Sequence, residues 1–322
     1  MTGWRPSSGP RAARTRAAML ARVRDYFQRE GVLEVETPVL GHAAVSDTQI
    51  ESFGIAQSAI SRQPLYLHTS PEFCMKRLLA AGYPDIFAIC RVFRDGEAGR
   101  RHQPEFTMIE WYRLGFSLAG IIADSVALIN TALGDRAPRY EPVAIDYREA
   151  FQRVLGVDPV EASVERLASL AAADAGLRHS IGEARDDWLD LLFATRIAPG
   201  FATDRLTVLR HYPASQAALA RLCPDDRTVA DRFEVFRGAL ELANGYVELT
   251  DAGEQQQRID ADNADRRHRG RTTRPVDTKL LAALQSGLPE CAGVALGFER
   301  LQMLHDATDD IRDVITFPYE PQ

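Results

Sequence analysis

The sequence predicts an α+β fold in which an antiparallel β-sheet is flanked by helices. Three observations lead to this class. Segments with strand character dominate the outer thirds of the 322-residue chain, helical periodicity dominates the middle, and the composition is that of an ordinary globular protein. Strands and helices that occur in separate runs are typical of an antiparallel sheet covered by helices.

The N-terminal part begins with a helix and continues with short strands. Residues 1–12 form a tail with Pro, Ser and Gly that we expect to be flexible, and apolar residues recur at helical spacing from about residue 14 to 30. Gly31 ends this helix. A short strand follows over residues 32–38, and a second is expected over residues 65–69.

A helix over residues 71–81 leads into a strand–loop–strand unit. Residues 87–94 and 106–113 are rich in β-branched and aromatic side chains, which favour strands. The residues between them are polar, cationic and contain glycine, and they form a longer loop than a tight hairpin needs. A helix over residues 118–133 follows.

The middle of the chain is a mostly helical insertion over residues 149–222. Ala and Leu recur there with helical periods, most clearly over residues 164–173 and 188–197. One strand is expected near residues 207–212. No internal repeat or low-complexity run is evident, and we expect a single domain over residues 1–322.

The C-terminal third returns to strand character over residues 232–250. A polar helix over residues 251–271, a buried strand over residues 293–297 and a helix from Phe298 to Leu304 follow.

Composition argues against several partners and compartments. The formal charge of −7 makes nucleic acid an unexpected partner, because such proteins usually carry a basic balance or stripe. No stretch approaches the ~20 apolar residues of a membrane span, and the basic N-terminus lacks the apolar segment of a secretory signal. The cysteines form no CxxC pair and are expected to be reduced thiols in a cytoplasmic protein: Cys74, Cys90, Cys223 and Cys291.

The loop between the paired strands is the first candidate site. Arg94 ends one strand, Phe106 opens the next, and the loop presents Arg100, Arg101 and His102. A strand-anchored arginine offers a rigid pair of donors to a phosphate, and an aromatic ring can stack on a base. Taken alone, such a loop is more often a solvated charged hairpin.

Three glutamates spaced by seven residues form the second candidate site: Glu234, Glu241 and Glu248. Gly238 and the neighbouring aromatic residues indicate strands. A spacing of seven alternates faces on a flat strand, so turns or bulges must intervene if the three are to converge. Converging carboxylates hold Mg²⁺ against phosphates or bind an ammonium, and an edge strand with alternating acidic residues is the alternative.

Two helix starts complete the candidates. A buried strand over residues 293–297 turns into a helix with Arg300 in its first turn, an arrangement that favours a phosphate, although Arg300 is equally compatible with a surface role. Ser70 and Glu72 are placed to cap the helix over residues 71–81, which is a sufficient structural reason for both. The alternative is that Glu72 accepts a substrate amine.

Taken in order, these segments resemble the three motifs of class II aminoacyl-tRNA synthetases. GVLEVETPVL (31–40) resembles motif 1, FRDGEAGRRHQPEFTMIEWY (93–112) motif 2 and GVALGFER (293–300) motif 3. The segments EVETP, TSPEFCMKRLL, ELANGYVELTD and RDVITFP are similar to those of lysyl enzymes. The resemblance runs from about Arg14 to Pro318. It implies a class II catalytic core that uses ATP and Mg²⁺ to activate a lysine-like amino acid.

The resemblance also implies a homodimer, because the helix and strand of motif 1 form the subunit interface in that family. The apolar face of the first helix is equally compatible with the core of a monomer. Its members are Ala17, Leu20, Val23 and Phe27.

Two features separate the chain from a lysyl-tRNA synthetase. Such an enzyme carries an anticodon-binding OB-fold of on the order of 100 residues before the first helix, and we expect none here. The segments HYPASQAALA, ELANGY-x-ELTDAxEQQQR and PECAGVALG instead resemble the elongation factor P–(R)-β-lysine ligases, paralogues without that domain. This resemblance implies a ligase that activates (R)-β-lysine as an adenylate and transfers it to a lysine of elongation factor P, with no stable tRNA binding. Alternatives are a tRNA-charging enzyme and a non-catalytic amino-acid-binding regulator.

The resemblance also implies roles for individual residues. Arg94 and Arg300 are the expected catalytic residues. The implied ATP site comprises Arg94, Asp95, Gly96, His102, Gln103, Phe106, Glu241, Leu242, Gly297 and Arg300. The implied substrate site comprises Ser70, Pro71, Glu72, Glu110, Tyr112, Asn244 and Glu248, and the implied magnesium ligands are Glu234 and Glu241.

Four positions depart from the family patterns. Asp95 and Gly96 stand where the family commonly has Asn and Glu, which affects the expected adenine contact and not the phosphate contacts. Gln103 replaces a more usual asparagine. Ala295 stands where the lysyl enzyme typically has glycine, and its methyl group is expected to favour the β-amino isomer by about 1–3 kcal/mol.

Overall fold

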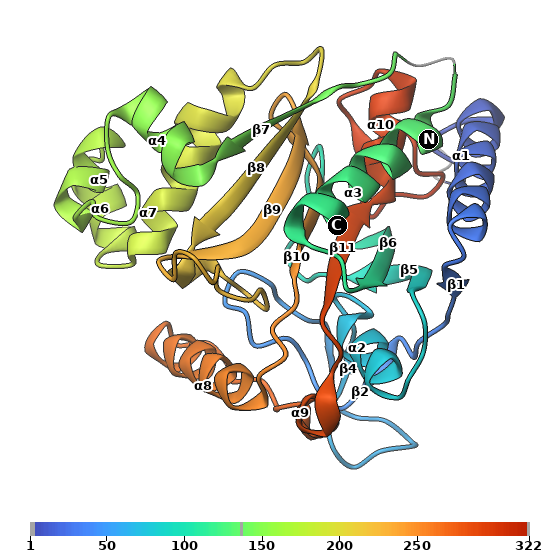
Figure 1. The fold of residues 1–322 in the computed structure, drawn as a ribbon, viewed down its shortest axis with the longest axis horizontal. Coiled ribbons are helices and arrows are strands. Elements are labelled where there is room, and N and C mark those ends of the chain that lie inside the picture. The colour runs from blue at the N-terminus through green and yellow to red at the C-terminus, as the bar shows by residue number, and fades with distance from the viewer. Residues whose placement is uncertain (1–3, 136–137, 321–322) are drawn as a thin grey trace.

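Eight strands form one mixed sheet at the centre of the computed structural model, which describes residues 4–135 and 138–320 (Figure 1). The strands lie in the spatial order β1 (Leu33–Glu34), β5 (Ile86–Phe93), β6 (Glu105–Leu114), β11 (Cys291–Gly297), β10 (Leu240–Val247), β9 (Val229–Arg237), β8 (Leu206–Pro213) and β7 (Pro142–Asp146). The expected α+β class is confirmed.

The sheet is antiparallel only from β5 to β8, which corrects the expectation of a wholly antiparallel sheet. The two outermost strands run parallel to their neighbours, β1 beside β5 and β7 beside β8. The crossover from β1 to β5 contains one α-helix, over Glu72–Ala80, and that from β7 to β8 contains several helices. Parallel pairing requires such long connections. The strand expected over residues 32–38 forms sheet pairs only at Leu33 and Glu34.

One face of the sheet is covered by α1 (Pro10–Arg29), α3 (Leu118–Leu133) and α10 (Phe298–Asp306). The helix α3 has the bounds that the sequence predicts, because Ser117 caps its N-terminus by accepting from Gly120 N and Gly134 follows its last turn at positive φ.

The helix α1 begins at Pro10, earlier than expected. Proline is tolerated there because the first N–H groups of a helix have no intrahelical partner. In the segment before it, Ser7 Oγ donates to the carbonyl oxygens of Arg312 and Ile315, which ties this segment to the C-terminal part of the chain. Residues 1–3 of the expected tail lie outside the described residues.

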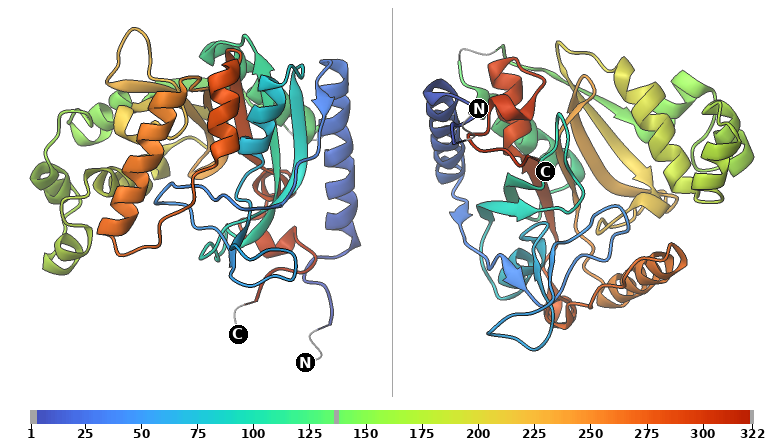
Figure 2. Two further views of the ribbon diagram at one scale, coloured as in Figure 1. Left: turned by 90° about the horizontal axis from the view of Figure 1, so that it is seen from below. Right: turned by 180° about the vertical axis from the view of Figure 1, so that it is seen from behind.

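The opposite face of the sheet carries α2 (Glu72–Ala80), α9 (Thr278–Gly287) and α8 (Ala252–His268), which stand in a row in Figure 2. Side chains alternate along β6, so Trp111 enters the core under α3 while Tyr112 faces α2. A small sheet of β2 (Leu40–Gly41), β4 (Leu65–Leu67) and β3 (Gly54–Ile55) lies beside α2 in the chain. None of the described helices is long and apolar enough to cross a membrane.

The middle of the chain folds as a group of helices outside β7 and β8 (Figure 1). It comprises α4 (Tyr147–Leu155), α5 (Val164–Leu170), α6 (Ala175–Ile181), α7 (Arg185–Leu192), a π-helical turn over Phe193–Ile197 and a 3₁₀ turn over Ala198–Gly200. Phe151 and Trp188 form a second hydrophobic core with Leu209 of β8 and Phe236 of β9. Helices with one strand near residues 207–212 agree with the sequence expectation. Further 3₁₀ turns lie at Ala214–Gln216 and Ile311–Asp313.

Candidate active site

A cavity of about 1060 Å³ opens on the face of the sheet that α2 and α8 border. Its walls come from the loop over residues 38–52, from α2, from the sheet, from α7 and from α8. The sequence-predicted residues that line it are Ser70, Pro71, Glu72, Arg94, Glu110, Tyr112, Glu234, Glu241, Asn244 and Glu248, together with Ala295. Segments far apart in the sequence therefore meet in one cavity.

A hairpin and a bulge bring the three spaced glutamates to this face. Glu234 lies on β9 and Glu241 on β10, with the turn between them at Gly238. The register between β9 and β10 shifts between Glu241 and Ala243, which confirms that a bulge must intervene. After the bulge, every second residue faces the cavity: Asn244, Tyr246 and Glu248.

Ser70 and Glu110 form the inner wall of a pocket within the cavity. Ser70 Oγ accepts from the backbone N–H of Glu72 at 3.0 Å and donates to Glu110 Oε2 at 2.7 Å. The N-cap of α2 is Pro71, which corrects the expected capping by Ser70 and Glu72. Ser70, one residue earlier, still binds the first helical N–H and also faces the pocket. Tyr112 Oη donates to the other carboxylate oxygen of Glu110 at 2.8 Å. Burial, reinforced by the charge of Glu72, raises the pKa of Glu110.

Lys76, to which the sequence assigns no role, is buried directly behind Glu72 and Glu248 of the pocket wall. Its ammonium lies 2.7 Å from Glu72 Oε1 and 2.5 Å from Glu248 Oε2, and only 1% of its side chain is exposed. Burial alone would lower the pKa of Lys76, but the charges of Glu248 and Glu72 outweigh burial and raise this pKa. Tyr246 Oη donates to Glu72 Oε1 at 2.8 Å.

Two sequence signals point to these added residues. Lys76 follows Glu72 at the i,i+4 spacing that places side chains together on a helix. Tyr246 stands midway between Asn244 and Glu248 at the two-residue period of a strand.

The floor of the pocket is formed by β11. Gly293 pairs with Tyr112 across the sheet, and a Cβ atom at position 293 would lie 2.5 Å from Tyr112 Cε1. Only glycine fits there without a shift of the pocket. Ala295 lines the cavity two residues further along, between Glu110 of β6 and Asn244 of β10 in the register of the sheet.

Arg94 and Phe106 lie together at the start of the motif 2 loop. The guanidinium carbon of Arg94 lies 5.2 Å from the centroid of the Phe106 ring. Arg94 Nε is buried and has no hydrogen-bonding partner among the described residues, and the nearest carboxylate, Glu97, is 3.6 Å from Nη1. Because an unpaired guanidinium N–H is costly to bury, this group is suited to receive an anion.

Arg300 links the helix start at α10 to β10 and to the motif 2 loop. Its Nη1 donates to the backbone oxygen and to Oε2 of Glu241, each at 3.1 Å. Its Nη2 lies 2.6 Å from His102 Nε2. Burial, followed by the charge of Arg300, lowers the pKa of His102, so its neutral ring nitrogen accepts this bond. The structure therefore brings together Arg300, His102 and Glu241, three residues of the implied ATP site.

The two expected magnesium ligands differ in ionisation. Burial, together with the charge of Glu241, raises the pKa of Glu234, whose Oε1 lies 2.7 Å from Arg232 Nη2. Burial acts the same way on Glu241, but Arg300 and Arg94 outweigh it and lower its pKa. The two carboxylates face one cavity, and their mutual repulsion would be relieved by a bound divalent cation. They therefore fit a cation that also binds phosphate oxygens.

Several implied ATP-site residues lie outside the lining of the cavity. Gln103 Oε1 accepts from the backbone N–H of Tyr319, so this side chain holds the C-terminal segment. Leu242 is buried in the core under α3, which leaves only its backbone to face a nucleotide. Asp95 donates its backbone N–H to Glu51 O. Gly96, at positive φ, and Gly297, at the junction of β11 and α10, also lie outside the lining. The same holds for His102, Phe106 and Arg300, which adjoin the lining through Arg94 and Glu241.

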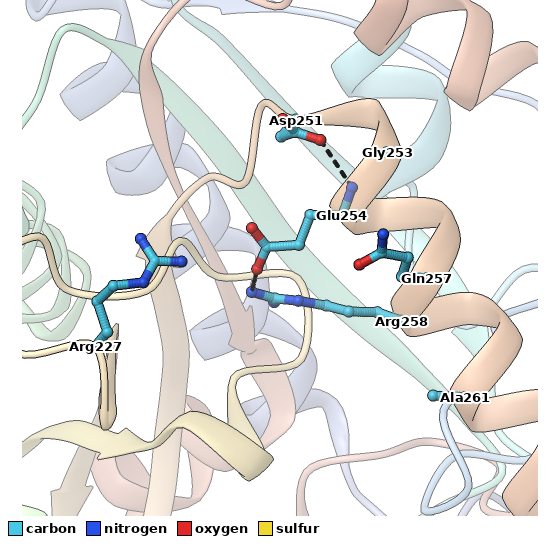
Figure 3. A pocket seen from close by; sticks show the side chains of 7 residues that line it. All are labelled: Arg227, Asp251, Gly253, Glu254, Gln257, Arg258 and Ala261. Carbon is cyan, nitrogen blue, oxygen red and sulfur yellow. Dashed lines mark hydrogen bonds and ion pairs between the residues drawn. The ribbon is translucent and has the colours of Figure 1, made fainter.

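A second, more open hollow of about 580 Å³ lies along α8 (Figure 3). Its polar groups largely satisfy one another. Asp251 accepts from the backbone N–H of Glu254, and the guanidinium of Arg258 donates to Glu254. The hollow therefore offers little beyond Arg227 for a ligand to bind.

Comparisons with known proteins agree with this geometry. The family of tRNA synthetases class II (D, K and N) matches residues 4–321. The chain is similar to elongation factor P–(R)-β-lysine ligases of Photorhabdus laumondii and Pseudoalteromonas translucida, each 44% identical over 98% of this chain and 97% of the relative. The ligase of Sodalis glossinidius is 43% identical over 98% of both chains. The chain therefore belongs to the class II tRNA synthetases of the D, K and N type and, within them, to the family of the elongation factor P–(R)-β-lysine ligases.

Proposed function

We propose that this protein is an ATP-dependent ligase that activates (R)-β-lysine as an aminoacyl adenylate and transfers it to a lysine side chain of elongation factor P. The observation that carries this proposal is the charge of the pocket. Three carboxyl groups, Glu72, Glu110 and Glu248, lie around one fixed cation, which pairs with Glu72 and Glu248. When all three are ionised, two negative charges remain for a ligand. A lysine-like amino acid carries two ammonium groups, and a pocket that is neutral when loaded avoids burying an unpaired charge.

Within this pocket we assign Ser70, Pro71 and Glu72 to the amine near the carboxylate of the substrate and Asn244 to the carboxylate itself. Glu110, Tyr112 and Glu248 enclose the distal ammonium. The hydrogen bonds from Ser70 and Tyr112 support this assignment, because they hold both oxygens of Glu110 in place. Ala295 on the floor distinguishes the β-amino isomer from α-lysine.

We assign the other end of the cavity to ATP. Arg94 contacts the α-phosphate, Arg300 and His102 hold the γ-phosphate end, and Phe106 stacks on adenine. Glu234 and Glu241 would hold Mg²⁺, which neutralises charge on the phosphates when bound. The buried, unpartnered Nε of Arg94 is the strongest support for the phosphate assignment.

The chemistry follows in two steps. A carboxylate oxygen of the amino acid attacks the α-phosphorus of ATP, the bond to the β-phosphate breaks, and pyrophosphate leaves. The neutral ε-amine of the acceptor lysine then attacks the adenylate carbonyl carbon, AMP leaves, and the amine loses a proton to water. The first step needs no protein nucleophile, because positioning and the charges of Arg94 and Arg300 stabilise the transition state.

We further propose a cytoplasmic homodimer that forms no stable complex with tRNA. An acceptor that takes part in translation supports the cytoplasm. In α1, Val23 and Phe27 are buried in the core of their own chain, so an interface would use the remaining surface of α1 and the exposed Leu33 of β1.

The test is ATP–pyrophosphate exchange with α-lysine and with both β-lysine enantiomers, followed by the mass of elongation factor P. We expect exchange to be fastest with (R)-β-lysine and the acceptor to gain the mass of one lysyl residue. Aminoacylation of tRNA in place of this mass gain would favour a tRNA-charging enzyme. The absence of AMP formation with every lysine isomer would favour a non-catalytic regulator.

A further inference from the structure

The cavity extends beyond the amino-acid pocket toward the helical group in the middle of the chain. Four residues mark this extension, which we call the acidic arm. Asp186 and Asp190 project from α7, Gln216 ends the turn Ala214–Gln216, and Tyr147 begins α4. None of them belongs to the residues assigned above to ATP or to the amino acid.

Within the part of the chain that the structure describes, the two carboxylates of the acidic arm form no ion pair, although the charges of Arg185 and Arg232 act on Asp186 and Asp190 from a distance. Asp186 accepts from Ser215 Oγ and Asp190 from Gln216 Nε2, each at 2.8 Å. Among the described residues, no Lys, Arg or His nitrogen lies within 4.0 Å of either carboxylate. The neighbouring Asp187, in contrast, lies 2.7 Å from Arg269 Nη1. Burial raises the pKa of both unpaired carboxyls, that of Asp190 to about 6.

Two further polar atoms of the arm are buried without a partner. Gln216 Oε1 accepts no hydrogen bond from the described residues, although the nitrogen of the same amide is engaged by Asp190. Tyr147 Oη is also unpartnered, and the side chain is 1% exposed. Buried polar atoms normally have a partner. The arm therefore offers hydrogen-bond acceptors and negative charge in excess of donors.

A ligand that complements this arrangement is positively charged and carries only hydrogen-bond donors. A lysine ammonium has three donors, no acceptor and a narrow four-carbon stem. The amino-acid pocket already has its own carboxylates. Arg232 stands between the two, because its Nε donates to Asn244 Oδ1 at 3.2 Å and its Nη1 to Gln216 O at 2.6 Å. The arm is thus a place for a second amine beside the activated amino acid.

We propose that the acidic arm receives the lysine ammonium of the acceptor protein and guides it to the adenylate. This inference rests on the proposed function, since it concerns the second of its two steps. The carboxylates of Asp186 and Asp190 attract the protonated side chain from solution, and the amide and hydroxyl oxygens of Gln216 and Tyr147 accept its hydrogen bonds as it enters. Beside the adenylate the ammonium loses a proton to water, and the neutral amine attacks the carbonyl carbon.

The experiment separates the two steps in the double variant Asp186→Asn/Asp190→Asn. We expect ATP–pyrophosphate exchange with (R)-β-lysine to stay within about twofold of the original protein, while the KM for elongation factor P rises roughly tenfold. Hydroxylamine, a small uncharged nucleophile, should trap the adenylate equally well in both proteins. The KM for the acceptor should rise with salt in the original protein and change less in the variant.

The matched control is Glu161→Gln/Asp225→Asn, which removes the same charge from exposed positions outside the cavity. Its acceptor KM should stay near the original value. An unchanged acceptor KM in the Asp186/Asp190 variant, or an equal loss of exchange and transfer, would overturn the proposal. If the double variant does not fold, the two single variants test the proposal instead. We expect the KM for elongation factor P to rise roughly threefold in each of them. Failure of the original protein to acylate the acceptor would instead remove the proposed function.

Discussion

Lys76 Nζ lies 2.5 Å from Glu248 Oε2, and both side chains are almost completely buried. In residues 4–135 and 138–320, no group has hydrogen-bond geometry to either oxygen of Glu248, so the contact is an ion pair without the alignment of a hydrogen bond. The ammonium of Lys76 thus partly neutralises the carboxylate of Glu248, whose oxygens are still able to accept hydrogen bonds from a substrate. The lysine sets the net charge that the pocket presents to a ligand.

Replacing Lys76 with Met should destabilise the protein, because it leaves Glu248 buried without its cation. Removing one partner of a buried ion pair costs about 3–5 kcal/mol. Burial already raises the pKa of Glu248 to about 8 with Lys76 in place, and loss of the ammonium raises it further, so the loss of stability should grow as pH rises from about 7 to 9. Urea denaturation at these two pH values measures it. Lys279→Met, at an exposed lysine, should change little, and a loss independent of pH would contradict the argument.

Replacing Arg94 with Ala should abolish measurable ATP–pyrophosphate exchange. The guanidinium is proposed to stabilise the charge that develops at the α-phosphate, and loss of such a donor costs roughly 10²–10³-fold in rate. Arg29→Ala removes an exposed guanidinium of α1 and should leave exchange intact. Near-normal exchange in the Arg94 variant would remove this residue from the proposed site.

Replacing Ala295 with Gly should shift the substrate preference from β-lysine toward α-lysine. The methyl group lines the floor of the cavity, and one methyl in a pocket discriminates by about 1–3 kcal/mol. The ratio of kcat/KM for the two isomers in the exchange reaction should therefore change by roughly 10–200-fold. A ratio that stays constant would show that another residue sets the preference.

Replacing Gly293 with Ala should raise the KM for the amino acid and leave the KM for ATP unchanged. The new Cβ would press on Tyr112, which holds Glu110 in place. Gly200→Ala is the matched control, because a Cβ there meets nothing within 4 Å. Exchange rates over a series of amino-acid and ATP concentrations separate the two effects. An equal rise in both constants would indicate general misfolding.

The KM for the amino acid should fall as pH rises from about 6 to 8. Burial and the charge of Glu72 raise the pKa of Glu110 in the empty pocket, so this carboxyl must lose a proton to bind an ammonium. In Glu110→Gln, KM should be high and should not fall over the same range. KM is measured by the exchange reaction in buffers of constant ionic strength. A KM of the original protein that rises with pH would contradict this role of Glu110.

Much of the secondary structure was predictable because its signals are local. The apolar period and the Ser117 cap define α3, and the β-branched and aromatic residues of β5 and β6 define the central strands. The parallel edges were not predictable in this way. Pairing of β7 with β8 depends on how a long helical crossover packs, and no local residue pattern records that direction.

The sequence by itself determined the class of the fold, the motifs and the residue types that we propose to hold phosphate and ammonium. Tertiary structure decided which of these side chains meet. The bulge after Glu241 turns Asn244 and Glu248 to the cavity, and it depends on pairing with β9. Lys76 contacts the pocket wall only because α2 packs against Glu248, far along the chain. Burial and charge pairing arise from contacts between distant segments, so they follow from the folded chain and not from local periodicity.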